Sequence, residues 1–290
     1  MSFSLDFIVS SLADGLLLGF VYGVAAMGLT LIWGVMDVIN LSHGPIIALG
    51  MYGIYYLFND GMGLNPYFSL LIVAVLGLLL GVLIYYTAVQ RVIDAPHLST
   101  LLATFSINMI IIGLGTAFLS TVPRNVDFTL GSVTSGPVTL PVTRLIAAIA
   151  AVLATGGLYL FLYRTRPGRY IRAVANNRSA AELVGVPSAR ILALSFGIGT
   201  MLAAISGGLI STFFSFSILS GARYELKSFV IGVLGGLGNP LGALIGGLIL
   251  GVLEGIIPVF IETSWVPVIE FGLFIMILLV RPSGLLGAKE

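Results

Sequence analysis

Residues 28–52 read GLTLIWGVMDVINLSHGPIIALGMY, an apolar run interrupted by a short polar segment. Gly44-Pro45 cannot continue an ordinary helix. In a bilayer, broken backbone is tolerated only where it is buried in protein or lines a cavity. The segment therefore predicts one of two arrangements. It is either a discontinuous helix beside a translocation path or a surface loop in which Ser42 caps the next helix.

The composition of the whole chain places this segment in a membrane. Of the 290 residues, 58% are hydrophobic and only 9% are charged, against about 25% charged in soluble domains. The net charge of +1 excludes a nucleic-acid binder, and the high hydrophobicity excludes disorder. The absence of cysteine excludes disulfides and thiol chemistry. We expect an integral membrane protein.

The charged residues divide the chain into apolar runs, and about 20 apolar residues cross a bilayer. We predict an all-α fold, a polytopic transmembrane helix bundle with broken or re-entrant helices, in which residues 1–290 form one transmembrane domain. No Lys or Arg precedes Arg91, so the first run lacks the basic region of a signal peptide and is expected to be retained. About eight spans are predicted, with seven to nine possible: 12–33, 44–59, 66–89, 98–121, 143–163, 190–215, 228–257 and 265–281.

The distribution of Lys and Arg predicts the orientation in the membrane. Residues 164–190 hold six of the 13 cations, so this loop is expected in the cytoplasm. Alternation from it places the N-terminus outside and the C-terminal tail in the cytoplasm. Residues 122–142 are rich in Val, Thr, Gly and Pro, which are strand and turn signals. We predict that they form an ordered extracytoplasmic loop.

Within the basic loop, the sequence predicts a short helix at about 180–184. Ser179 and Glu182 have the spacing of a capping box, and Gly185 stands where a helix C-cap is expected. Two interpretations remain open: a docking element for a cytoplasmic partner, or a solvated basic loop that only sets topology. The apolar residues of AAELVG favour docking, because a purely solvated loop has no need of them.

Glycine is concentrated in the C-terminal part of the chain. Gly247-x3-Gly251-x3-Gly255 and Gly15-x3-Gly19-x3-Gly23 are typical of closely packed membrane helices. The segment 235–240, GGLGNP, interrupts an apolar run, as half-helices at transport sites do. It is not a nucleotide loop, and Lys227-Ser228 has Leu226 where a Walker A motif requires glycine. We expect no ATP-binding site and no cofactor in this chain.

Three polar side chains lie inside apolar runs. Glu254 and Glu270 are interpreted either as proton- or ligand-binding groups or as residues paired with a neighbour. Asn108 either lines a path or hydrogen-bonds another helix. The sequence contains no nucleophile–base pair and no metal-ligand cluster, so it does not predict an enzyme.

Taken together, the segment 28–52 and three later blocks resemble the permease subunits of high-affinity branched-chain amino acid ABC importers. The later blocks cover residues 168–209, 233–255 and 281–287, and the similarity is greatest to the shorter of the two permeases of such importers. The resemblance implies a bacterial or archaeal cytoplasmic membrane and a pseudo-symmetric heterodimer with a second related permease. It also implies two cytoplasmic ATPase subunits that hydrolyse ATP, and a periplasmic or surface solute-binding protein.

The resemblance also assigns candidate residues. Ser179 stands where the family often has Glu, so the coupling pattern is imperfect. The candidates for ATPase coupling are Arg169, Arg172, Ala180, Ala181, Glu182 and Gly185. The candidates for the translocation path are Asn40, Ser42, His43, Asn108 and Asn239.

Two other functions remain open at this stage. The first is an ion-coupled secondary transporter of small solutes, with Glu254 as the coupling carboxylate. The second is a channel-like or scaffold membrane protein without energy coupling. Relatives of the resembled permeases also carry urea, amides and organic acids, so the sequence does not identify the solute.

Overall fold

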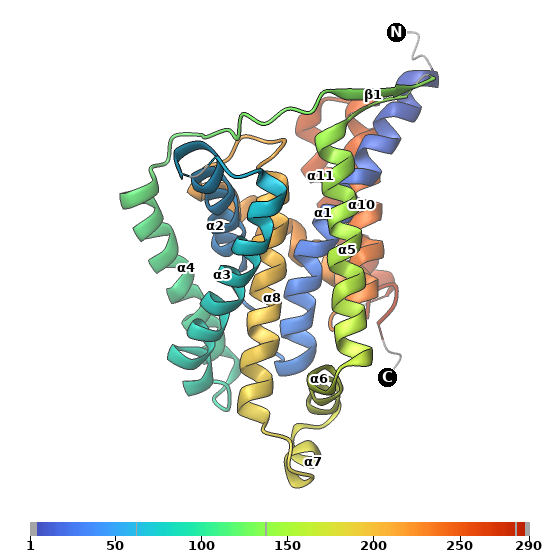
Figure 1. The fold of residues 1–290 in the computed structure, drawn as a ribbon. Coiled ribbons are helices and arrows are strands. Elements are labelled where there is room, and N and C mark those ends of the chain that lie inside the picture. Colours follow the sequence, from blue (N-terminus) through green and yellow to red (C-terminus); the bar gives the residue numbers. More distant parts are fainter. Residues whose placement is uncertain (1–4, 62, 137, 282, 288–290) are drawn as a thin grey trace.

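The computed structural model describes residues 5–61, 63–136, 138–281 and 283–287 and is built almost entirely of helices (Figure 1). The long helices are α1 (Leu5–Met36), α3 (Pro66–Thr87), α4 (His97–Leu119), α5 (Val142–Arg164), α8 (Ser188–Ile210), α10 (Pro240–Phe260) and α11 (Val266–Val280). The shorter elements are α2 (His43–Tyr55), α6 (Arg166–Asn176), α7 (Arg178–Leu183), α9 (Gly221–Gly235), β1 (Ser132–Ser135) and β2 (Val138–Pro141). Single turns of helix lie at Tyr56–Gly61, Val89–Arg91, Ile218–Ser220 and Thr263–Trp265.

The predicted polytopic helix bundle is confirmed. Seven helical segments of the described chain are long and apolar enough to cross a membrane, namely the seven long helices, with α11 extended back to Thr263. Two of the predicted spans have another structure. Residues 44–59 lie in α2 and the π turn after it and are not among the seven, and residues 228–257 are divided between α9 and α10, of which α10 is one of the seven.

The helix α9 is too short to cross the bilayer alone. At 1.5 Å per residue, its 15 residues extend about 22 Å, against a hydrocarbon core of roughly 30 Å. The 13 residues of α2 are followed directly by the π-helical turn Tyr56–Gly61. Between α9 and α10 the chain reverses at Gly236 (φ 104°) and Gly238 (φ 83°), a left-handed backbone that glycine adopts readily. Asn239 then caps α10 by accepting hydrogen bonds from the backbone N–H groups of Leu241 and Gly242.

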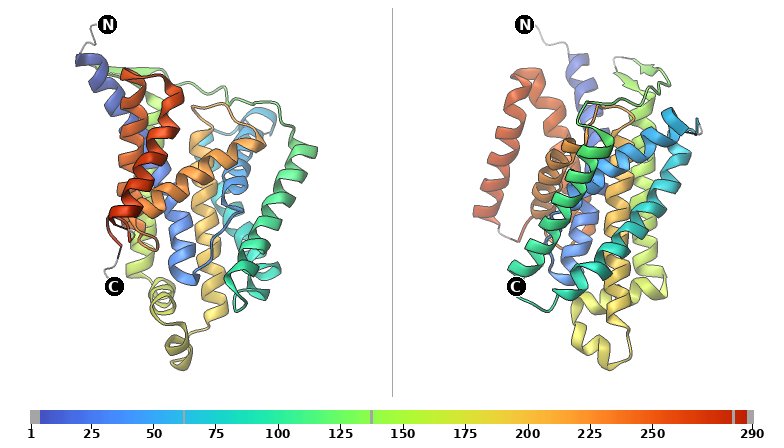
Figure 2. Two further views of the ribbon diagram at one scale, coloured as in Figure 1. Left: turned by 180° about the vertical axis from the view of Figure 1, so that it is seen from behind. Right: turned by 90° about the vertical axis from the view of Figure 1, so that its left-hand side faces the viewer.

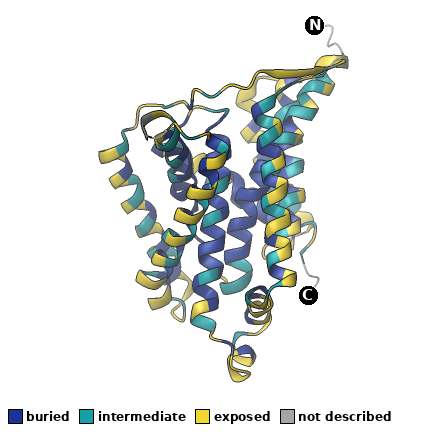
Figure 3. Ribbon diagram, viewed as in Figure 1, coloured by how far each residue is buried: buried dark blue, intermediate teal, exposed yellow. Residues whose placement is uncertain are grey.

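The core lies around α1 and α8, which are the most deeply buried of the long helices (Figure 3). The helices α2, α3 and α4 stand on one side of this pair, and α5, α10 and α11 stand on the other (Figures 1 and 2). The helices α4 and α11 are the least buried. Their outer faces carry large apolar side chains, such as Phe118 and Leu279, that are about four-fifths exposed.

Glycine allows α1 and α10 to pack backbone against backbone. A Cβ atom added to Gly19 would lie 2.8 Å from the carbonyl oxygen of Gly247, and one added to Gly247 would lie 2.6 Å from the Cα of Gly23. Gly15, Gly251 and Gly255 continue the same line of contact. The two predicted glycine ridges therefore face each other and form one seam, here called the glycine seam.

The two ends of the bundle differ in structure. The hairpin end carries the N-terminus and the antiparallel pair β1–β2, in which Ser132 faces Pro141 (Figure 1). The strand and turn signals in residues 122–142 are thus confirmed. The opposite end, here called the α7 end, carries α6 and α7, which project beyond the long helices (Figure 1). Which end faces the cytoplasm stays a prediction of the charge distribution.

The glycine seam predicts a sharp difference between two leucine substitutions. Gly247→Leu should prevent close approach of α1 and α10 and destabilise the fold by about 1–3 kcal/mol or more. Gly156→Leu on α5 should be tolerated, because a Cβ there meets nothing within 4 Å. Thermal unfolding of the two purified variants in detergent measures the difference, and equal melting temperatures would contradict the seam.

Candidate functional site

The broken segment before α2 is buried in the bundle. The Ser42 hydroxyl donates a hydrogen bond to Oδ1 of Asn40 at 2.6 Å. The Nε2 atom of His43 lies 2.9 Å from the carbonyl oxygen of Ala25 in the middle part of α1. All three side chains are essentially inaccessible. The interpretation as a surface loop is therefore wrong: the polar segment between α1 and α2 is buried in the protein.

Two side chains of helix α4 donate hydrogen bonds to backbone carbonyl groups of the segment before α2. The Thr104 hydroxyl donates to the carbonyl oxygen of Ile39 at 3.0 Å, and Nδ2 of Asn108 donates to that of Leu41 at 2.6 Å. These two side chains are four residues apart, so they lie on one face of α4. They replace hydrogen bonds that an unbroken helix would have made, as membrane burial requires.

Helix α9 contributes an acid at the start of α2. The Glu225 carboxylate accepts a hydrogen bond from the backbone N–H of Gly44, so a negative charge stands at the positive end of the helix dipole. The contact is close because Gly44 and Gly221 meet through their backbones. Sequence reasoning did not single out Glu225, although an acid between apolar residues was the available signal.

Four of the five predicted path residues come together at this break: Asn40, Ser42, His43 and Asn108. Three of their buried atoms, Nδ2 of Asn40, Nδ1 of His43 and Oδ1 of Asn108, have no hydrogen-bond partner in the described part of the chain. The fifth, Asn239, lies elsewhere, at the start of α10, where its Nδ2 donates to the carbonyl oxygen of Leu286. That these residues line a path stays a prediction.

At the α7 end, α6 begins at a regular cap and is held close to α5. The Thr165 hydroxyl accepts a hydrogen bond from the backbone N–H of Gly168 at 3.1 Å. The Nε of Arg172 donates to the carbonyl oxygen of Leu162 at 3.2 Å, and its guanidinium carbon lies 4.4 Å from the ring centre of Tyr163. Arg172 therefore ties α6 to the end of α5, and both Arg172 and Arg169 are exposed.

The predicted short helix is present as α7, but the predicted capping box is wrong. The residue that caps α7 is Asn177, whose Oδ1 accepts a hydrogen bond from the backbone N–H of Ala180 at 2.9 Å. Asn is as good a cap as Ser, and here it stands at the residue where the helix begins. The C-terminal prediction is confirmed, because the helix ends at Gly185 (φ 85°): the N–H of Gly185 donates to the carbonyl oxygen of Glu182, and the N–H of Val186 donates to that of Ala181.

Glu182 therefore does not cap α7, as the predicted capping box would require, and its carboxylate has other partners. Its carboxylate accepts a hydrogen bond from the Ser188 hydroxyl, which joins α7 to the start of α8, and another from Nε of Arg178 within α7. These hydrogen bonds, first that of Ser188, lower the pKa of Glu182 below its usual range. The group is ionised at neutral pH, and the tie weakens only as the pH falls through that lowered pKa.

The residues predicted to couple the permease to the ATPases differ in their exposure. Ala180, Glu182 and Gly185 are exposed, but Ala181 is buried against the protein. The outermost apolar side chains are Leu183 and Val184, which are 88% and 81% exposed. An apolar tip of this kind on a charged loop is typical of a contact surface for another protein.

Charged residues form a cluster toward the hairpin end, among α1, α5, α9, α10 and α11. Lys227 forms ion pairs with Glu254 and, at 3.5 Å, with Glu270, and Arg144 pairs with Asp14. The interpretation of Glu254 and Glu270 as paired residues is thus confirmed. Sequence reasoning missed Asp14 and Arg144, because 130 residues separate the two partners.

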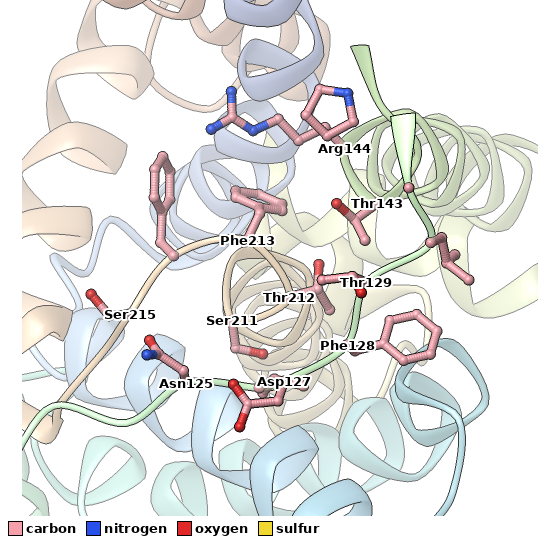
Figure 4. Close-up of a pocket in the computed structure, with 15 residues that line it drawn as sticks. Asn125, Asp127, Phe128, Thr129, Thr143, Arg144, Ser211, Thr212, Phe213 and Ser215 are labelled. Atoms are coloured by element: carbon pink, nitrogen blue, oxygen red, sulfur yellow. The ribbon is translucent and has the colours of Figure 1, made fainter. Parts of the chain in front are cut away.

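Two cavities lie beside this cluster. The first has a volume of about 420 Å³ and is lined by residues of α1, α9 and α10 and by Arg144. The second, of about 470 Å³, lies at the hairpin end between residues 125–131 and the loop 211–215. Figure 4 shows the second cavity, with Asp127, Ser215 and Arg144 around it. Arg144, Phe214 and Ser215 border both cavities.

Comparison with known proteins identifies the family of this architecture. Residues 11–279 match the family model described as the permease component of the branched-chain amino acid transport system. The chain belongs to this permease family. Because the match spans nearly all the helices, the break, the glycine seam and the α6–α7 pair are parts of one permease subunit.

Individual relatives agree with this assignment. The permease is 30% identical to the high-affinity branched-chain amino acid transport system permease protein LivH of Escherichia coli, over 100% of this chain and 99% of that one. It is 29% identical to BraD, a permease protein of the same description from Pseudomonas aeruginosa, over 97% and 96% of the two chains. The ribose import permease protein RbsC of Escherichia coli is 27% identical over 81% and 73%. No solved structure matches.

The cluster predicts that Lys227 is indispensable to the fold. Lys227→Met should destabilise the permease by about 3–5 kcal/mol, because it removes the cation beside the buried Glu270 and leaves Glu254 with only the longer pair to Arg223. Arg91→Met, which removes an exposed cation on a single turn of helix, is the control and should change little. The yield of folded protein in size-exclusion chromatography measures both variants, and an unaffected yield of Lys227→Met would contradict this role.

Proposed function

We propose that this permease is the translocation subunit of an ATP-driven importer that moves branched-chain amino acids, or closely related small solutes, into the cytoplasm. The observation that carries the proposal is the match over the full chain with permeases whose names state that transport. The lower coverage of the sugar permeases favours amino acids over sugars. The resemblance places the importer in the cytoplasmic membrane of a bacterium or archaeon.

The proposed assembly has four kinds of subunit. A solute-binding protein delivers the solute at the hairpin end, which is the extracytoplasmic end by the charge rule. A second related permease completes the channel in a pseudo-symmetric heterodimer. Two ATPases bind at the α7 end, in the cytoplasm. The exposed apolar faces of α4 and α11 contact lipid or the second permease.

In this assembly the permease binds no nucleotide and no cofactor, and the partner ATPases hydrolyse ATP. Lys227, which a nucleotide site would need as a free cation, is buried in contact with Glu254 and Glu270. The same pairing weakens the alternative of an ion-coupled transporter, because Glu254 is not an isolated carboxylate. Energy then has to enter through another subunit.

The helix α7 is proposed to transmit ATPase movement to the bundle. Leu183 and Val184 supply an apolar contact, and the hydrogen bonds of Glu182 with Ser188 carry the movement into α8. Helix α8 packs closely on α1, α2 and α3 through Gly199, Gly207 and Gly197. A tilt of α8 therefore displaces the broken helix α2, where the unpartnered polar atoms of Asn40, His43 and Asn108 are proposed to border the path.

Loss of the apolar tip should uncouple the importer. Leu183→Asp with Val184→Asp should reduce copurification of the ATPases and ATP-driven uptake by tenfold or more, the scale of a lost interface hot spot of about 1.4 kcal/mol or more. Leu183→Met with Val184→Ile keeps the surface apolar and is the control. Both variants should melt like the unchanged protein, since these side chains are exposed. Retained ATPase binding in the aspartate variant would contradict docking at α7.

The function itself is tested by reconstitution of the complete complex in proteoliposomes. Labelled leucine should accumulate only with internal ATP and with the binding protein outside. Uptake driven by a proton or sodium gradient without ATP would instead establish the secondary transporter. Accumulation of urea or of a sugar in preference to leucine would place the substrate in another class.

A further inference from the structure

The charged cluster contains an ion pair that is open to a cavity. Nη2 of Arg223 and Oε1 of Glu254 are 3.8 Å apart, which is longer than the 2.7–3.2 Å of a hydrogen bond between nitrogen and oxygen. The side chain of Arg223 is 65% exposed, whereas that of Glu254 is only 14% exposed. Both residues line the cavity of about 420 Å³. The pair therefore offers one cation and one anion to a third group.

The rest of the cluster holds Glu254 through further contacts, among them a hydrogen bond that the Tyr22 hydroxyl donates to its carboxylate. Lys227 pairs with the other oxygen of Glu254, Oε2, from behind, and lies 4.8 Å from the ring centre of Tyr22. Arg144, which also lines the cavity, forms an ion pair with Asp14. Its guanidinium lies over the rings of Phe213 and Phe214. The Glu254 carboxylate is consequently held in place, while the side chain of Arg223 is largely exposed.

The charge balance of the cluster selects the kind of ligand. Arg144, Arg223 and Lys227 supply three cations, and Asp14, Glu254 and Glu270 supply three anions. A ligand with a single charge would leave one charge uncompensated beside the buried side chains of Lys227, Glu254 and Glu270, which is costly. A zwitterion adds no net charge, and its two groups can each pair with one side of the open ion pair.

The dimensions and the remaining walls fit a small amino acid. The cavity volume of about 420 Å³ lies within the roughly 300–1,000 Å³ of small-ligand sites. Leu18, Pro258 and Phe214 give apolar surface beside the charged groups. Arg144, Phe214 and Ser215 also border the cavity at the hairpin end, so the two cavities are neighbours.

We propose that this cavity binds the zwitterionic head of a free α-amino acid, with its carboxylate on Arg223 and its ammonium group on Glu254. The inference rests on the proposed function and assigns the permease its own recognition of the amino acid, in addition to that by a binding protein. Arg223 donates in a fork that matches a carboxylate, and Oε1 of Glu254 accepts from the ammonium group. The apolar side chain of the amino acid then lies toward Leu18 and Pro258.

The absence of cysteine from the sequence allows a direct test on the assembled complex in membrane vesicles. Ser215→Cys places a single thiol at the border of the cavity, and Ser132→Cys places one on the exposed strand β1 as a control. N-ethylmaleimide labelling is measured with leucine, with 4-methylpentanoate, which lacks the amino group, and with 3-methylbutylamine, which lacks the carboxylate.

Leucine should slow labelling of the Ser215→Cys variant several-fold, and neither analogue should do so at the same concentration. Addition of Arg223→Gln should raise the half-protecting leucine concentration about tenfold, the loss expected for one charge-assisted hydrogen bond. Arg223→Lys should restore part of that loss, and Arg91→Gln should have no effect. The Ser132→Cys variant should react at the same rate with and without leucine.

Several results would overturn the proposal: no protection by leucine, equal protection by either analogue, or protection that survives Arg223→Gln. Uptake of leucine with ATP is measured in the same vesicles. Uptake without protection would overturn the zwitterion site and leave the proposed function standing. Loss of both in a folded, assembled complex would overturn both.

Discussion

Backbone-to-backbone contact at glycine sets the distances on which the rest of this permease depends. Gly19 and Gly247 bring α1 and α10 together, and Gly199, Gly207 and Gly197 do the same for α8 and its neighbours. Lipid tails are as apolar as the side chains, so association of helices depends on such close packing. The approach also brings Tyr22 of α1 to the same cavity as Glu254 of α10. The positions of the charged groups therefore follow from the glycine contacts.

Close packing also makes the broken helix possible. The carbonyl groups freed before α2 need donors inside the protein, and α4 supplies them from Thr104 and Asn108. Glu225 meets the amide end of α2 because Gly44 and Gly221 touch. A helix that starts inside the bundle can thus change its position with α8 without exposing backbone to lipid. In the proposed importer, this connects the exposed tip of α7 with the interior.

Much of this arrangement was predictable from local sequence. The scarcity of charge, the apolar runs and the Gly-Pro break predict a broken helix bundle, and Gly185 predicts the end of α7. The errors also have local causes. Residues 44–59 have the hydrophobicity of a span but end in a π turn, and Asn177 competes with Ser179 as a cap two residues earlier. Hydropathy alone does not distinguish a short buried helix from a lipid-crossing one, since both are apolar.

The sequence by itself determined the class of protein, the family and the place of the basic loop, because composition and short motifs carry that information. Only the tertiary structure decided which charges meet. Asp14 and Arg144 are 130 residues apart in the sequence, and Lys227 meets Glu254 only because α9 and α10 fold back at Gly236 and Gly238. Ion pairs between distant segments depend on helix packing. The periodicity of apolar and polar residues along the chain therefore does not predict these ion pairs.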